Sequence, residues 1–110
     1  MKKQELNNQQ KKWLKSMAHS LRPLIQIGKQ GITEIWLQQL EKALNKRELL
    51  KVSLLPNAPV TKSQAAELIE TKLPANVLQK IGHVLVIYQR SKDKENRYFS
   101  EKVKHLSVKE

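Results

Sequence analysis

The chain alternates between short β-type segments and helix-length amphipathic segments, and this alternation constrains its fold more than any other feature. Residues 24–27 and 49–55 are rich in branched aliphatic side chains and predict strands. Between them, residues 33–46 carry apolar side chains at helical spacing, which predicts a helix with Thr33 as its N-cap. A strand, a helix and a strand in succession predict a right-handed crossover between parallel strands. The predicted inward face of the helix consists of Ile35, Trp36, Leu40, Ala43 and Leu44.

Further regular elements are expected on both sides of this unit. A basic amphipathic helix is predicted over residues 8–21, and another helix over residues 62–73. Residues 76–81 and 84–89 predict two strands that the tight turn Gly82-His83 joins into an antiparallel hairpin. The expected fold is therefore α/β: a small mixed four-stranded sheet packed with three helices, in the order α-β-α-β-α-β-β.

The composition of the chain changes near residue 90. Residues 1–92 contain all of the predicted strands and helices, whereas residues 93–110 are mostly polar and charged. No packed element is predicted there, because apolar side chains are sparse: Phe99, Val103, Leu106 and Val108. We therefore expect one domain over residues 1–92 and a basic flexible tail over residues 93–110, part of which could dock on the domain.

The charge balance points to a polyanionic partner. Lysine and arginine number 21 against 10 acidic residues, so the formal net charge of this 110-residue chain is +11. No apolar run approaches the roughly 20 residues of a membrane-spanning helix, and polar residues follow the basic start Met1–Glu5, so neither a membrane partner nor a signal peptide is expected. The chain has no cysteine. We expect a cytoplasmic protein that binds nucleic acid.

Two glycines separate the first predicted strand from the following helix, in the sequence Gly28-Lys29-Gln30-Gly31. Glycine lets a backbone turn sharply and approach a ligand closely, and a helix N-terminus offers unpaired N–H groups to an anion. Lys29 adds a cation at the tip of the loop. KH domains use a similar two-glycine loop on single-stranded nucleic acid, so the sequence indicates a contact with a phosphate backbone. The alternative is a simple turn, and Glu34 in the first helical turn would repel a phosphate.

Cations that precede this loop form a candidate phosphate-binding strip beside it: Lys11, Lys12, Lys15 and Arg22. The alternative is a solvated helix face. His19 could stack on a base, contact a phosphate, or serve as a structural partner of the helix C-terminus.

The aromatic side chains allow two interpretations. Trp13 and Trp36 lie on apolar stripes, so we expect them in the core. Tyr98 and Phe99 lie among charges and could stack on RNA bases. A disordered tail with incidental aromatic residues is the favoured interpretation of that segment.

Nothing in the sequence predicts catalysis. The three histidines lack metal-ligand spacing, and Asp93 is the only aspartate. No nucleophile and base stand out as a pair, and the loop lacks the pattern of a nucleotide-hydrolysing P-loop. We therefore expect no metal, no cofactor and no small-molecule substrate, and we expect that the protein is not an enzyme.

Parts of the chain resemble one known family: residues 15–33 (KSMAHSLRPLIQIGKQGIT), 47–52 (RELLKV) and 81–90 (IGHVLVIYQR). They are similar to the signature of CRM-domain proteins, named for chloroplast RNA splicing and ribosome maturation, whose bacterial stand-alone members are the YhbY-type proteins. The resemblance covers about residues 10–92. It implies a fold like the C-terminal domain of translation initiation factor three, and binding of structured RNA through Gly28, Lys29, Gln30 and Gly31.

Bacterial members of that family are associated with precursors of the large ribosomal subunit, and plant members with group II intron splicing. We therefore expect a monomer that binds large-subunit ribosomal RNA in a pre-ribosomal particle as an assembly factor. The alternatives are a general RNA chaperone, an intron-splicing-type RNA binder, an RNA-processing enzyme and a DNA-binding architectural protein. Incubation with labelled ribosomal RNA tests for the enzyme, and competition by duplex DNA tests for the DNA-binding protein.

Overall fold

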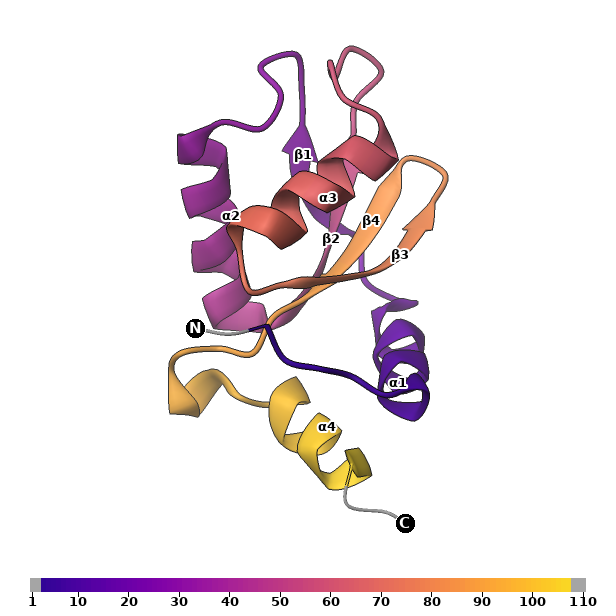
Figure 1. Cartoon of the computed structure of the whole chain (residues 1–110), viewed down its shortest axis with the longest axis vertical. Helices are drawn as coiled ribbons and strands as arrows, with labels where there is room; N and C mark the ends of the chain where they lie inside the picture. The colour runs from indigo at the N-terminus through magenta and orange to yellow at the C-terminus, as the bar shows by residue number, and fades with distance from the viewer. Residues whose placement is uncertain (1–2, 108–110) are drawn as a thin grey trace.

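The computed structural model describes residues 3–107 and places a four-stranded sheet between two pairs of helices (Figure 1). The helices are α1 (Asn8–Ala18), α2 (Glu34–Arg47), α3 (Lys62–Lys72) and α4 (Phe99–Ser107), with a short 3-10 helix, η1 (Lys94–Asn96). The strands are β1 (Pro23–Ile27), β2 (Leu49–Leu54), β3 (Asn76–Ile81) and β4 (Val84–Tyr88). The predicted order of three helices and four strands is confirmed, and η1 and α4 follow it.

The strands are arranged in the order β1-β2-β4-β3. β1 and β2 are parallel, with Ile25 opposite Val52, as expected for two strands joined through a helix. β4 is antiparallel to both β2 and β3. In the turn between β3 and β4, Gly82 has a φ of 56°, a conformation that favours glycine. The mixed sheet that the sequence predicts is therefore confirmed.

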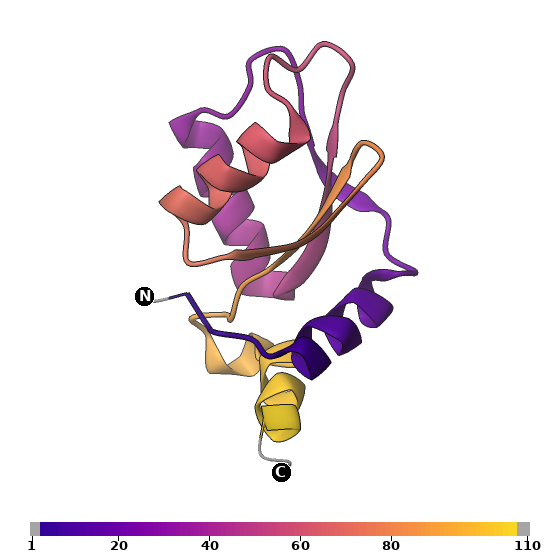
Figure 2. The ribbon, with the colours of Figure 1, turned by 45° about the vertical axis from the view of Figure 1, so that its right-hand side comes forward.

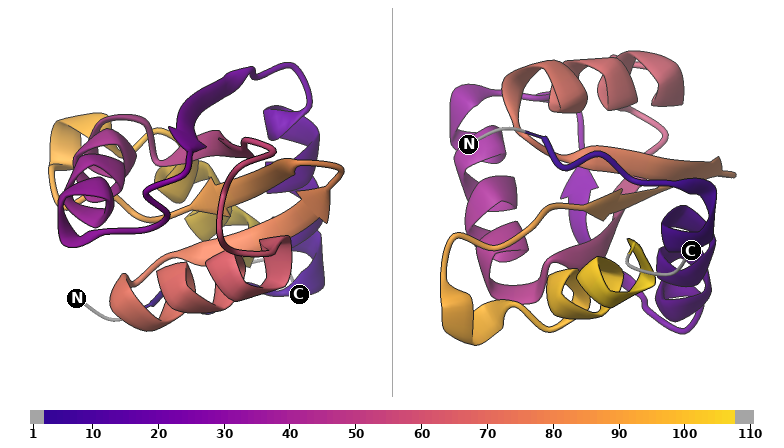
Figure 3. Two further views of the ribbon diagram at one scale, coloured as in Figure 1. Left: turned by 90° about the horizontal axis from the view of Figure 1, so that it is seen from above. Right: turned by 60° about the horizontal axis from the view of Figure 1, so that its bottom comes forward.

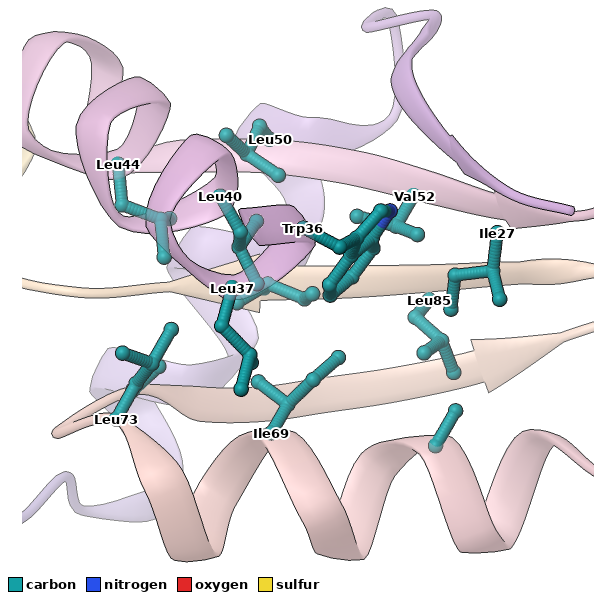
Figure 4. Packing of buried hydrophobic residues seen from close by; sticks show 13 residues of the cluster. Ile27, Trp36, Leu37, Leu40, Leu44, Leu50, Val52, Ile69, Leu73 and Leu85 are labelled. Atoms are coloured by element: carbon teal, nitrogen blue, oxygen red, sulfur yellow. The ribbon is translucent and has the colours of Figure 1, made fainter. Parts of the chain in front are cut away.

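The larger hydrophobic core fills the space between the sheet and the helices α2 and α3 (Figure 4). Leu40 and Leu44 of α2 and Ile69 of α3 have no exposed surface, and they pack in one cluster with Val52 and Leu85 of the sheet. Burial of each such side chain stabilises the fold by about 1.5–3 kcal/mol relative to its exposure to water. This core fixes the position of α2, and with it the end of the glycine loop.

One predicted core position of α2 is wrong. The sequence predicts Ile35 on the buried face, but Ile35 is 68% exposed, whereas Leu37 is buried. The buried face of α2 is centred on Leu40, and successive residues of a helix are about 100° apart around its axis. Ile35 therefore points away from the sheet, and Leu37 lies at the margin of the buried face.

The opposite face of the sheet carries a smaller core beneath α1 and α4, which lie side by side (Figure 3, right). Leu14 of α1 and Val103 of α4 are fully buried in a cluster with Leu49 and Tyr88 of the sheet. The side-chain amide of Gln10 donates a hydrogen bond to the Val103 carbonyl oxygen (2.9 Å). Figure 2 shows both helices at one end of the molecule, opposite the end that carries the loop between β1 and α2.

Part of the predicted flexible tail is folded in the structure. Residues 94–96 form η1 and residues 99–107 form α4. The inference that apolar residues are too sparse there for a packed element is wrong, because Phe99, Val103 and Leu106 are four and three residues apart, the spacing of one helical face. Phe99 and Val103 pack with α1. Residues 108–110, which include Val108, lie outside the described residues, and the domain boundary at residue 92 stays a prediction.

A buried carboxylate fastens this C-terminal segment to the rest of the fold. Glu48, between α2 and β2, has no exposed surface, and its φ of 65° is a left-handed conformation that is strained for glutamate. Its carboxylate accepts hydrogen bonds from the Ser91 N–H (2.8 Å), the Ser100 N–H (2.9 Å) and the Ser100 hydroxyl (2.6 Å). The chain is thus held on both sides of Tyr98, which lies between the two serines.

The N-terminal residues are also tied to the sheet. The hydroxyl of Tyr88, which is fully buried, donates a hydrogen bond to Oε1 of Gln4 (2.6 Å). Burial, and then the nearby charge of Glu48, raises the pKa of Tyr88 above its ordinary value near 10. The hydroxyl therefore stays protonated at neutral pH and keeps its role as a donor.

Candidate nucleic-acid interface

The loop between β1 and α2 lies at the top of the molecule in Figure 1. The Gly31 N–H donates to the Gly28 carbonyl oxygen (3.0 Å), which closes a turn, and Lys29 and Gln30 are exposed at its tip. Gly31 has a φ of 72°, and a Cβ at this position would lie 3.1 Å from Cγ of Pro59. The fold therefore requires glycine at position 31.

The base of the loop is held by hydrogen bonds from neighbouring elements. The indole N–H of Trp36 donates to the Gln26 carbonyl oxygen (2.8 Å), and the Thr33 hydroxyl caps α2 by accepting from the Trp36 backbone N–H (3.1 Å). The Leu55 N–H donates to the Ile27 carbonyl oxygen (3.0 Å). The predicted N-cap is confirmed, and the exposed tip is carried on a fixed base.

Gly28 differs from Gly31 in what the fold demands of it. Its φ lies outside the left-handed region, and an added Cβ would lie 3.7 Å from Cδ1 of Leu55, an ordinary van der Waals distance. Neither backbone conformation nor crowding explains glycine here. The remaining explanation for glycine at position 28 is that it lets the backbone approach a ligand closely.

The structure separates the predicted cation strip from the loop. β1 has five residues, and strands rise about 3.3 Å per residue, so Arg22 before β1 and Gly28 after it are roughly 20 Å apart. Lys11, Lys12 and Lys15 lie on α1, which Figure 1 shows at the lower right, far from the loop at the top. The prediction that these cations lie beside the loop is therefore wrong, because the length of β1 stands between them. Their contact with RNA stays a prediction.

Some of these predicted residues meet on a second surface, between α1 and the uncovered part of the sheet. Lys15, His19 and Lys51 line a pocket of about 270 Å³ together with Pro23 and Val84. The Lys51 ammonium lies 3.5 Å from the His19 carbonyl oxygen, and His19 itself is exposed at the C-cap of α1. Lys51 is a cation of this surface that the sequence analysis missed.

Arg22 lies next to two further cations that the sequence analysis missed. It precedes β1, while Lys46 and Arg47 end α2 shortly before β2. Since β1 and β2 are parallel, their starts lie at the same edge of the sheet, and the three cations line one pocket. The signal was available in the sequence, because a strand–helix–strand unit brings the residues before its two strands to one edge.

Among the described residues, no carboxylate forms an ion pair with the cations of these surfaces. Within residues 3–107, the ion pairs no longer than 4.0 Å join Lys3 to Glu70 (3.8 Å) and Lys92 to Glu41 (3.2 Å). The loop cation Lys29 is exposed and takes part in neither pair. The basic groups at the loop and at the start of β1 are therefore available to an external anion.

Residues 3–107 contain neither a metal-binding cluster nor a membrane-spanning helix. No group of three or more histidine, aspartate or glutamate side chains in residues 3–107 is placed to hold a metal ion. No helix in the same range combines the length and the apolar character that a membrane crossing requires.

Comparison with known proteins gives a consistent result. Residues 6–89 match the model of the CRS1/YhbY (CRM) domain. A Bacillus subtilis protein named "Probable RNA-binding protein YqeI" is 39% identical over 88 residues, which cover 80% of this chain and 92% of that protein. A Haemophilus influenzae protein named "RNA-binding protein" is 39% identical over 80% of this chain and 89% of its own length.

A solved structure has the same fold. The solution structure of a hypothetical protein of Staphylococcus aureus, described as a candidate RNA binder, matches with a TM-score of 0.68 and 39% sequence identity. The match covers 82% of this chain and 94% of that protein.

Proposed function

Because this chain belongs to the CRS1/YhbY (CRM) domain family, we propose that it is an RNA-binding protein, that its RNA is large-subunit ribosomal RNA in precursor particles, and that it acts there as an assembly factor rather than as an enzyme. The observation that carries the RNA-binding part is the match, over most of both chains, to relatives named as RNA-binding proteins. The choice of large-subunit RNA rests on the family resemblance.

The geometry of the loop supports a backbone contact. Lys29 projects a cation from an exposed turn, Gly28 leaves space for close approach, and the base of the turn is fixed by hydrogen bonds. Such contacts position RNA without reading its sequence. We assign the phosphate contact to Gly28, Lys29, Gln30 and Gly31, and a second contact to α1 through Lys11, Lys12, Lys15 and His19.

Sedimentation of cell extract tests the cellular part of the proposal. At low salt, the protein is expected to travel with precursors of the large subunit and to be depleted from mature ribosomes and polysomes, because an assembly factor leaves once its site is covered. Raising the salt should release it, since phosphate contacts are salt-sensitive. Detection by immunoblot, with sequencing of crosslinked RNA, makes the assignment. Recovery mainly with small subunits or chromosomal DNA would contradict it, and equal recovery with all RNAs would favour a general RNA chaperone.

Substitutions in the loop test the contact surface. Lys29→Ala is expected to weaken binding to ribosomal RNA about tenfold, the size of one charge-assisted hydrogen bond, with a thermal midpoint close to that of the parent. Lys42→Ala is the matched control, because Lys42 is an exposed lysine of α2 on no surface assigned here. Equal RNA affinity of Lys29→Ala and the parent would remove the loop from the interface.

The two glycines are expected to behave differently. Gly31→Ala should lower the free energy of unfolding by about 1–2 kcal/mol, because alanine is strained in the left-handed region. Gly28→Ala should leave stability within about 0.5 kcal/mol of the parent while weakening RNA binding. Denaturant unfolding and fluorescence anisotropy measure the two effects. Unchanged RNA binding by Gly28→Ala would show that the backbone at Gly28 does not approach the ligand.

A further inference from the structure

A pocket of about 440 Å³ lies at the start of β1, between the end of α2 and the C-terminal segment. The family match ends at residue 89, so the side of the pocket formed by Asn96, Tyr98 and Phe99 comes from a part of the chain outside it. η1 lies beside the end of α2 (Figure 3, right), which brings this segment to the cations there.

The charged lining of this pocket has one sign. Arg22, Lys46 and Arg47 are all exposed, and among residues 3–107 no carboxylate lines the pocket. Lys46 and Arg47 also offset the negative end of the α2 dipole. Two guanidinium groups and an ammonium group in one place suit a phosphate, because arginine donates to phosphate oxygens through two parallel N–H groups.

The remaining lining suits a flat apolar ring. Tyr98 is 58% exposed and Leu24 is 47% exposed, and both line the pocket. The Tyr98 ring meets the Phe99 ring edge-on at a centroid distance of 5.1 Å and an interplanar angle of 85°, and the Lys102 ammonium lies 5.7 Å from the Tyr98 ring centroid. Tyr98 and Leu24 thus offer apolar surface beside the cations of the pocket, and a nucleobase would cover this surface.

The position of Tyr98 is fixed before any ligand arrives. The buried carboxylate of Glu48 holds Ser91 and Ser100, which lie on either side of Tyr98 in the chain. Phe99 packs in turn on Trp13, with ring centroids 6.0 Å apart. A ring held in this way loses little freedom on binding, which favours stacking.

We propose that this pocket binds one unpaired nucleotide of RNA, with its base against Tyr98 and Leu24 and its phosphates at Arg22, Lys46 and Arg47. The inference rests on the proposed RNA-binding function and adds a third contact to those of the loop and of α1, about the length of β1 away from the glycine loop. The pocket volume is within the range of small-molecule sites. The protein would then hold RNA where a duplex ends in an unpaired nucleotide, with the pocket on that nucleotide.

Two RNA probes and two variants test the proposal. The probes are a blunt RNA duplex and the same duplex with a short single-stranded overhang that carries 2-aminopurine. The overhang should improve the affinity of the parent protein, and binding should quench the 2-aminopurine through stacking. Tyr98→Leu should weaken binding of the overhang probe roughly tenfold, the effect of one lost base stack, abolish the quenching and leave the blunt duplex unaffected. Tyr98→Phe keeps the ring and should restore both signals.

The outcomes separate this proposal from the proposed function. If the parent binds neither probe, RNA binding itself fails and the pocket fails with it. If the parent binds both probes equally, or if Tyr98→Leu retains the quenching, only the nucleotide pocket is overturned. A parallel variant, Arg22→Gln with Arg47→Gln, should lower affinity for the overhang probe more than Lys42→Gln with Lys72→Gln does, because both pairs remove the same charge and only the first lines the pocket. Equal losses would count against the pocket.

Discussion

Replacing Glu48 with alanine is expected to lower the free energy of unfolding by about 3–5 kcal/mol, the largest loss we expect from a single polar substitution in this protein. The Glu48 carboxylate is fully buried and accepts hydrogen bonds from two backbone N–H groups and one hydroxyl, at 2.6–2.9 Å. Alanine would leave the donors of Ser91 and Ser100 in a buried space without partners, and each such donor costs about 1–3 kcal/mol.

Two further substitutions at this position separate the side chain from the backbone. Glu48→Gly also removes the carboxylate, but it relieves the strain of the positive φ and should be about 1 kcal/mol more stable than Glu48→Ala. Glu48→Gln keeps one acceptor oxygen but replaces the other with an NH2 group, which cannot accept from the donors of Ser91 and Ser100. Its stability should therefore lie between those of the alanine variant and the parent. Glu67→Ala, which removes an exposed acid of α3, controls for the change in net charge.

Denaturant unfolding measures these differences, and amide hydrogen exchange locates them. Exchange should increase first in residues 99–107, because Glu48 connects this segment to the rest of the fold through Ser100. Glu48→Ala within about 1 kcal/mol of the parent would contradict the assignment of Glu48 as the residue that fastens α4.

The main elements of the fold could be predicted because each depends on local pattern. The alternation of aliphatic residues in β2, the continuous apolar run of β4, and the helical spacing and N-cap of α2 are all readable along the chain. The parallel pairing of β1 and β2 follows from the helix between them. The error at Ile35 arose because neighbouring apolar residues, Trp36 and Leu37, leave the centre of a helical face ambiguous.

The docking of the C-terminal segment could not be predicted in the same way. Phe99 and Val103 have helical spacing, but the surrounding charges mask it. The contact between Glu48 and Ser100 joins residues 52 positions apart and depends on burial that only the assembled fold provides. In the sequence, Glu48 is an ordinary acidic residue that follows Lys46 and Arg47 at a charged helix end.

The position of the glycine loop between β1 and α2 could be predicted from the sequence, whereas the predicted position of the cations beside it was wrong. Closeness in sequence suggested that Lys15 and Arg22 lie beside Gly28, but an extended strand carries the chain away by its full length. The same strand places Arg22 beside Lys46 and Arg47, because parallel strands start at one edge. The folding of η1 and α4 brings Tyr98 to this surface.

The affinity for RNA should fall steeply as the salt concentration rises. The slope of log affinity against log salt should be proportional to the number of cations that contact phosphate. Each phosphate neutralised on a single strand contributes about 0.7 to the slope of log affinity against log salt. The loop and the pocket supply Lys29, Arg22, Lys46 and Arg47. These cations predict a slope of about −2.8, or roughly a 600-fold loss of affinity for a tenfold rise in salt. If Lys11, Lys12 and Lys15 also contact phosphates, the slope should approach about −5.

A triple variant tests whether the cations of the pocket contribute to this slope. Replacing Arg22, Lys46 and Arg47 with glutamine should reduce the slope by about 2, because three released counterions are lost at about 0.7 each.

The matched control replaces Lys42, Lys72 and Lys94, which are exposed and lie outside the pocket. It removes the same charge from the same protein, so it lowers the general attraction to RNA equally, but it should leave the slope nearly unchanged because no direct contact is lost. Anisotropy titrations of the overhang duplex across a salt series measure both slopes. Equal slopes for the two triple variants would mean that net charge alone, and not the pocket at the start of β1, determines the attraction to RNA.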